Sequence, residues 1–324
     1  MEVQNRLIEI INNAIKDISY PSVAPGLFDP IKYTLSVGGK RIRPLLTLMS
    51  TSLFTEDINP AISPAIGIEV FHNFTLLHDD LMDNALIRRK QPTVHVKWDA
   101  NTAILSGDAM QILAYKLVAA SPSEHLKQVI DLFSKTALEI CEGQQFDMEF
   151  ESREDVPEGE YIEMIRLKTA VLLGCALKVG AIIGGAENKD ADLLYTFGEK
   201  IGLAFQLKDD LLDVYGDPKV FGKNIGGDIL NNKKTFLLIK ALELSSEKDN
   251  RQIRGKLKEV NFSAEEKIEF FTSVYNNSGA KNECGKRMEE YFNMGLKALK
   301  RVNIETEKKY ELEKLASQLM YRES

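Results

Sequence analysis

Two acidic motifs, each with two adjacent aspartates and a third three residues later, constrain this chain more than any other feature. The first ends at Asp83 and the second at Asp213, and each lies in a largely apolar run with helical spacing. At 3.6 residues per turn, Asp79 lies one turn from Asp83 on the same helix face, and Asp209 likewise from Asp213. Like charges at this spacing cost a helix about 0.2–0.5 kcal/mol per pair, and apolar neighbours add a desolvation cost. We therefore expect each motif to bind a cation.

The residue types in the motifs indicate a hard metal ion. Carboxylates without His or Cys ligands suit Mg²⁺, which prefers a few carboxylates together with water and substrate phosphates. The candidate metal ligands are Asp79, Asp80, Asp83, Asp209, Asp210 and Asp213.

Hydrophobic periodicity is helical along the chain, without sustained alternation of the strand kind. No composition break or long linker marks a second domain. The sequence therefore predicts an all-α single domain over residues 1–324, a bundle of roughly ten or more helices around a central apolar cavity.

Charge and cysteine content exclude several classes of protein. A formal net charge of −7 argues against a nucleic-acid-binding protein. The three cysteines are odd in number and widely spaced, which favours neither a disulfide framework nor a zinc site. The N-terminal segment is amphipathic rather than a signal peptide, and no apolar run approaches a membrane span. We predict a cytoplasmic protein with no membrane span.

Basic residues recur at loops and helix starts that suit phosphate groups. Gly38-Gly39 precede Lys40-Arg41-Ile42-Arg43-Pro44, and Pro44 fits the first turn of a helix. Arg88-Arg89-Lys90 follow the first acidic motif, and arginine can grip a phosphate with two donors. The alternatives are a solvated basic loop and a loop that only compensates local charge.

Further candidate polar residues lie on helices or in a later loop. Lys168, beside Thr169 in an apolar run, must find an anion or extend to solvent. His72 and Gln206 share faces with the acidic motifs, and His72 is either a structural residue or a ligand. Gln144 and Asp147 share a face and make either surface hydrogen bonds or part of a site. Lys223 in a glycine-rich loop and Lys233 at the next helix are weak phosphate signals alone.

Together, the acidic motifs, the basic residues and the apolar helices suit an enzyme that breaks the carbon–oxygen bond between an organic group and diphosphate. Carboxylates could bind a diphosphate through several Mg²⁺ ions and make it a good leaving group. Arginines and lysines could hold a second diphosphate without metal. The apolar helix faces imply that the organic part of the substrate is apolar. The released diphosphate could take up any proton that is lost.

The sequence resembles the trans-isoprenyl diphosphate synthases of the polyprenyl synthetase family over nearly the whole chain. The resemblance rests on the two acidic motifs and on Gly38 to Pro44, Arg88-Arg89, Pro92-Thr93-Val94-His95, Gly143-Gln144, Lys168-Thr169 and Phe205-Gln206. It implies an all-α fold, usually a homodimer. It also implies head-to-tail 1′-4 condensation of isopentenyl diphosphate with an allylic diphosphate, assisted by about three Mg²⁺ ions.

The resemblance also implies a role for each matching residue. Asp79, Asp83 and Asp209 would be Mg²⁺ ligands, supported by Asp80, Asp210 and Asp213. Isopentenyl diphosphate would be held by Gly39, Lys40, Arg43, His72 and Arg89. The allylic diphosphate would be held by Arg88, Lys168, Thr169, Gln206, Lys223 and Lys233, with Thr169 and Gln206 near the developing carbocation.

Residues just before the first acidic motif would form the floor of the elongation pocket in this family. Phe71, Phe74 and the smaller Thr75 occupy those positions, which favours a C20 over a C15 product. The alternatives are a class I terpene cyclase and a non-catalytic subunit of a heteromeric synthase. The isopentenyl diphosphate motif argues against the first, and the complete set of aspartates argues against the second.

Overall fold

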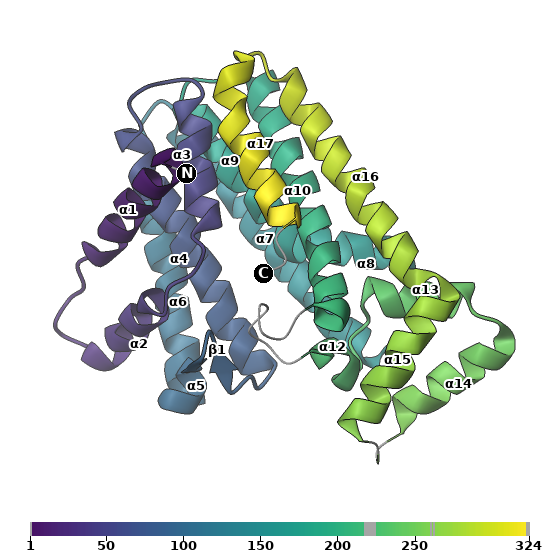
Figure 1. The fold of residues 1–324 in the computed structure, drawn as a ribbon. Helices are drawn as coiled ribbons and strands as arrows, with labels where there is room; N and C mark the ends of the chain where they lie inside the picture. Colours follow the sequence, from purple (N-terminus) through teal and green to yellow (C-terminus); the bar gives the residue numbers. More distant parts are fainter. Residues whose placement is uncertain (1, 217–224, 260, 262, 322–324) are drawn as a thin grey trace. The chain divides into compact units, whose positions relative to one another are not determined.

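The computed structural model describes residues 2–216, 225–259, 261 and 263–321 (Figure 1). The candidate residue Lys223 lies outside the described residues, so its predicted role stays a prediction.

The chain is helical almost throughout, which confirms the predicted all-α class. The helices are α1 (Glu2–Lys16), α2 (Pro25–Ser36), α3 (Ile42–Ser52), α4 (Asn59–Met82), α5 (Val94–Lys97), α6 (Ala100–Val118), α7 (Leu126–Ser152), α8 (Glu158–Ile165), the π-helix η1 (Arg166–Ala170), α9 (Val171–Ile183), α10 (Asn188–Tyr215), α12 (Gly227–Leu230), α13 (Phe236–Leu244), α14 (Glu247–Lys258), α15 (Ala264–Ser278), α16 (Ala280–Arg301) and α17 (Thr306–Tyr321). Within the described ranges, none of these helices is both long and apolar enough to cross a membrane.

A short hairpin interrupts the helices. In the part of the chain that the structure describes, the β-structure consists of β1 (Ile87–Arg88) and β2 (Gln91–Pro92), which pair antiparallel. The sequence did not predict this hairpin, because two-residue strands are too short to show alternation.

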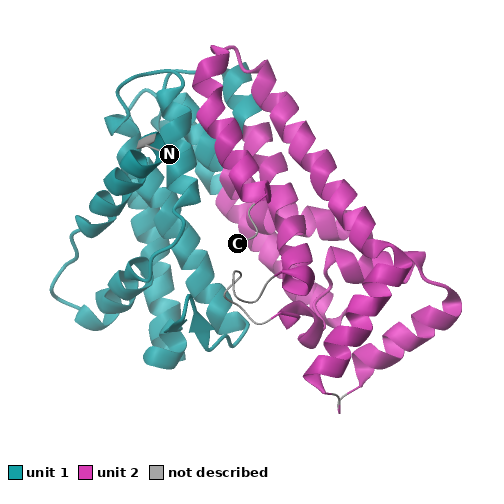
Figure 2. Ribbon diagram, in the orientation of Figure 1, with its two compact units in different colours: residues 1–134, 175–194 teal, residues 135–174, 195–324 magenta. Residues whose placement is uncertain are grey.

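The chain forms two compact units (Figure 2). Unit 1 comprises residues 1–134 and 175–194, and unit 2 comprises residues 135–174 and 195–324. The unit boundaries therefore fall within α7, α9 and α10. The single-domain organisation stays a prediction.

In unit 1, two glycines allow α4 and α6 to pack closely. A Cβ atom added at Gly67 of α4 would lie 2.7 Å from Val118 Cγ2 of α6. A Cβ atom added at Gly107 of α6 would lie 2.1 Å from His78 Nε2 of α4, so the imidazole occupies the space that a side chain would fill. This packing fixes the helix that carries the first acidic motif.

In unit 2, α13 contributes to an apolar cluster. Phe236, Leu237 and Leu238 are almost fully buried there, together with Tyr275 of α15 and Cys284 of α16. The helix begins after Thr235, whose hydroxyl accepts a hydrogen bond from the backbone nitrogen of Leu238. The start of α13 is thereby fixed beside the second acidic motif, because the backbone nitrogen of Phe236 donates to Asp210.

Candidate active site

The first acidic motif lies at the C-terminal end of α4 and is paired with Arg88 of β1. The helix ends at Met82, and Asp83 is its exposed C-cap. Arg88 Nε donates to Asp80 Oδ1 at 2.7 Å, and Arg88 Nη2 lies 3.5 Å from Asp79 Oδ2. Desolvation raises the pKa of Asp80, and the positive charge of Arg88 opposes that shift. The hairpin therefore compensates charge locally, as one alternative reading of the sequence proposed.

The turn of the hairpin brings Arg89 to the glycine-rich loop before α3. Arg89 and Lys90 have φ values of 53° and 63°, as both central residues of a type I′ turn require. Arg89 Nη1 donates to the carbonyl of Gly38. A Cβ atom added at Gly39, whose φ is 150°, would lie 2.9 Å from both terminal guanidinium nitrogens of Arg89. Two predicted residues, Gly39 and Arg89, are thus in contact, while Lys40 is exposed.

Arg41 is a buried anchor whose role the sequence did not reveal. It is 5% exposed, and its Nη1 donates to Glu69 Oε1 of α4 at 2.8 Å. Its Nη2 donates to the carbonyl of Leu35 at 2.7 Å, and Asn73 Nδ2 donates to the same Glu69 oxygen at 3.2 Å. The only sequence signal was its place in the basic motif, which gave no reason to expect burial.

His72 is surrounded by arginines in unit 1. Desolvation, followed by the positive charges of Arg43, Arg89, Arg88 and Arg41, holds the pKa of His72 well below its usual value. Burial likewise lowers the pKa of Arg43 to about 10, with Glu69 opposing the shift and Arg89 adding to it. The Nε atom of Arg43 is buried and has no hydrogen-bond partner among the described residues. A neutral imidazole among guanidinium groups makes this a site of positive potential that suits a phosphate.

The second acidic motif, on α10, contains three aspartates in different surroundings. Asp210 is buried, and its Oδ2 accepts hydrogen bonds from Tyr161 Oη at 2.6 Å and from the backbone nitrogen of Phe236 at 3.0 Å. Burial raises the pKa of Asp210 to about 8, and the charge of Asp228 acts in the same direction. Asp213 Oδ2 accepts from the backbone nitrogen of Asp228 at 3.0 Å.

Asp209 is only partly buried, so its surroundings differ from those of Asp210. The predicted metal roles of the aspartates stay predictions. Lys233 lies just before α13, and its backbone nitrogen donates to the carbonyl of Asp228 at 2.9 Å.

The π-helix η1 carries Lys168 and Thr169. Lys168 Nζ donates to Asp147 Oδ2 of α7 at 2.7 Å, so of the two alternatives for this lysine, an anion or solvent, the structure shows an anion. Thr169 Oγ1 donates to Gln206 Oε1 of α10 at 3.4 Å. A π-turn within a helix is often found at functional sites, and the sequence did not predict this one.

The residues expected to set the product length form an aromatic cluster in unit 1. The Phe71 and Phe74 rings are buried with centroids 5.4 Å apart, and Phe74 also lies 4.8 Å from the imidazole of His78. Phe71 packs edge-on against Phe133 at 5.2 Å. The hydroxyl of Thr75 donates to the carbonyl of His72 at 2.8 Å.

The donor set of the acidic motifs suits Mg²⁺ in combination with a substrate. In the described part of the chain, no group of three His, Cys, Asp or Glu side chains could hold a metal ion. Mg²⁺ is usually bound through one or two carboxylates with substrate phosphates and water, rather than in an all-protein cage. Aspartates beside arginine-rich loops provide this kind of partial site.

We predict that replacing His72 by Gln makes the protein less sensitive to acid. The folded-state pKa of His72 lies below its unfolded value of about 6.5, so the unfolded state binds the proton first as the pH falls. The stability that this contributes is present above about pH 6.5 and is lost as the pH falls toward the folded-state pKa. Urea unfolding at about pH 7.5 and about pH 5.5 should show a larger loss for the wild type than for His72→Gln. The matched control, His125→Gln, should behave like the wild type. Equal losses in the wild type and His72→Gln would contradict the prediction.

Comparisons with known proteins identify the family to which this chain belongs. The profile of the polyprenyl synthetase family matches residues 24–274. A geranylgeranyl pyrophosphate synthase from Geoglobus acetivorans is 37% identical over 97% of each chain. A geranylfarnesyl diphosphate synthase from Natronomonas pharaonis is also 37% identical, over 72% of this chain and 74% of that protein.

A crystal structure of a geranylgeranyl pyrophosphate synthase superimposes with a TM-score of 0.92 at 44% identity, over 100% of this chain and 98% of that one. The family match covers well over half of the chain, and the relatives extend over most of it. The chain therefore belongs to the polyprenyl synthetase family.

Proposed function

We propose that this chain, a short-chain trans-prenyltransferase, condenses isopentenyl diphosphate with an allylic diphosphate to give geranylgeranyl (C20) diphosphate. The observation that carries the proposal is the arginine cluster around neutral His72, two turns along α4 from the first acidic motif. The arginine cluster suits a phosphate that is bound without metal, and the acidic motif suits a phosphate that is bound through Mg²⁺.

Each group of residues has a defined part in the proposed reaction. Bound Mg²⁺ would neutralise the allylic diphosphate and make it a better leaving group. Asp79, Asp83 and Asp209 would hold the ions. Lys168 would add positive charge at the diphosphate, and the oxygen atoms of Thr169 and Gln206 would stabilise the allylic cation. The other three aspartates of the motifs would support these ligands.

The isopentenyl diphosphate would be held without metal. Gly39, Lys40, Arg43, His72 and Arg89 are the proposed contacts. The unpartnered Nε of Arg43 supports this role, because a phosphate oxygen would supply the missing acceptor. Arg88, Lys223 and Lys233 are the proposed further contacts of the allylic diphosphate.

We predict that the protein extends an allylic diphosphate only with Mg²⁺ and isopentenyl diphosphate present. Replacing Asp79 or Asp209 by Asn should reduce kcat by about 10² or more, because a metal ligand is lost. Asp192→Asn is the matched control, since Asp192 pairs with Lys178 at 2.6 Å and lies in neither motif. Radiolabelled product formation measures the rate.

Other outcomes of the same assay would identify the alternatives. Failure to extend any allylic primer would defeat the proposal. A terpene cyclase would consume the allylic diphosphate without isopentenyl diphosphate, whereas a non-catalytic subunit would consume neither.

We predict that Phe74→Ala lengthens the product by one or more isoprene units. Phe74 is buried against Phe71 and His78, so its loss would open space at the proposed floor of the elongation pocket. Chromatography of the dephosphorylated products measures their length. Phe270→Ala on α15 is the control for loss of an aromatic ring and should leave the length unchanged. An unchanged product length in folded Phe74→Ala would refute the floor assignment.

A homodimer and a cytoplasmic location are further parts of the proposal. Ile104 and Ile112 lie two turns apart on α6 and are 47% and 72% exposed, with Leu105 beside them 60% exposed. Exposed apolar residues of this kind often mark a protein interface. Ile112→Glu should therefore convert the dimer into a monomer, as measured by light scattering. A monomeric wild type would contradict the proposal.

The free thiols of all three cysteines are compatible with a reducing compartment.

A further inference from the structure

The π-helix η1 is held between two glycines of unit 2. A Cβ atom added at Gly143 of α7 would lie 2.3 Å from the backbone nitrogen of Lys168. A Cβ atom added at Gly202 of α10 would lie 2.7 Å from the Cα atom of Ala170. Both close approaches are to backbone atoms, which cannot move aside as the end of a side chain can. The neighbouring helices therefore leave η1 little freedom to change its path.

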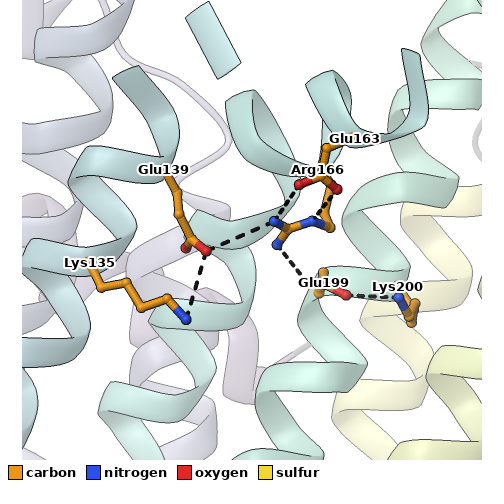
Figure 3. A network of polar contacts seen from close by, with 6 residues as sticks. All are labelled: Lys135, Glu139, Glu163, Arg166, Glu199 and Lys200. Atoms are coloured by element: carbon orange, nitrogen blue, oxygen red, sulfur yellow. Dashed lines mark hydrogen bonds and ion pairs between the residues drawn. The ribbon is translucent and has the colours of Figure 1, made fainter. Parts of the chain in front are cut away.

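An ion-pair network holds the first residue of η1 (Figure 3). Arg166 donates through Nε and Nη2 to the two carboxylate oxygens of Glu163, each at 2.8 Å. Its Nη1 donates to Glu199 Oε2 of α10 at 3.2 Å, and its Nη2 lies 3.9 Å from Glu139 Oε1 of α7. Lys200 pairs in turn with Glu199 at 2.8 Å. One guanidinium group thus joins η1 to α7, α8 and α10.

The ion pairs, the glycine contacts and the predicted substrate residues follow one another along the same helices. On α7, Glu139, Gly143 and Asp147 are spaced by four residues, so they lie on one face. On α10, Glu199, Gly202 and Gln206 are spaced by three and four residues in the same way. Each helix therefore presents to η1 an acid, then a glycine, then a partner of Lys168 or Thr169.

We propose that Arg166 is a positioning residue that fixes the register of η1 and thereby the placement of Lys168 and Thr169 toward the allylic diphosphate. The inference rests on the proposed function, because it assumes that these two residues act on that substrate. Arg166 itself is not assigned a contact with substrate. Its effect passes through the backbone of the five residues of η1.

The experiment compares Arg166→Met and Arg166→Lys with the wild type under steady-state conditions. Arg166→Met should lower kcat/KM for the allylic diphosphate by about 10–100-fold, the range found when a residue that orients a metal ligand is lost. The KM for isopentenyl diphosphate should change less than about twofold, because its proposed contacts lie elsewhere in the chain. Arg166→Lys keeps the charge but loses the bidentate hydrogen bonding, so its effect should be intermediate between those of the wild type and Arg166→Met.

Arg287→Met is the matched control. Arg287 also pairs with two acids, Glu158 at 2.8 Å and Glu290 at 3.4 Å, but it lies on α16 and not on η1. This variant should keep wild-type kinetics. If Arg166→Met fails to fold, Glu199→Gln provides the same test, because it removes one anchor and leaves the pair of Arg166 with Glu163 intact.

The outcomes separate the two proposals. Wild-type protein that extends no primer would reject the proposed function. Active wild type with unchanged allylic kinetics in folded Arg166→Met, or in Glu199→Gln, would reject the positioning role. Equal losses for both substrates would also reject it, since a general loss of structure would not distinguish them.

Discussion

The buried ion pair between Arg41 and Glu69 is the interaction on which the arginine-rich part of the site depends. The two side chains are 5% and 3% exposed, and removing one partner of such a pair typically costs about 3–5 kcal/mol. The backbone of Arg41 has a φ of 51°, a left-handed conformation that non-glycine residues seldom adopt. The pair ties the loop before α3 to α4, the helix of His72. Without this buried pair, the loop before α3 would lose this link to α4.

The same constraint, burial of charge, explains why the aspartates of the two motifs are not equivalent. Asp80 is compensated by Arg88, whereas Asp210 is buried beside a tyrosine hydroxyl and a backbone nitrogen. Burial raises the pKa of both carboxyl groups, and it does so most clearly for Asp210, to about 8. A carboxyl group that already accepts two hydrogen bonds has less capacity left for a metal ion.

The sequence predicted the helices, the acidic motifs and the basic loops because these depend on spacing along a short stretch of chain. It could not predict the partners of Arg41 and Asp210, because Glu69 and Tyr161 lie 28 and 49 residues away. The surroundings of Lys168 could be predicted from the sequence only in part. Its position in an apolar run favoured an anion as its partner, but only the packing of η1 against α7 identified Asp147.

The glycines inside the helices show how this packing is achieved. A glycine in a helix interior costs about 1 kcal/mol relative to alanine, so from the sequence alone each one looks like a weak point. Gly107 instead admits the ring of His78, while Gly143 and Gly202 admit the backbone of η1. The lost helix propensity is offset by contacts that no larger residue would permit. Because His78 lies against Phe74 and η1 carries Lys168, these three glycines place both the proposed floor of the elongation pocket and the residues proposed to hold the allylic diphosphate.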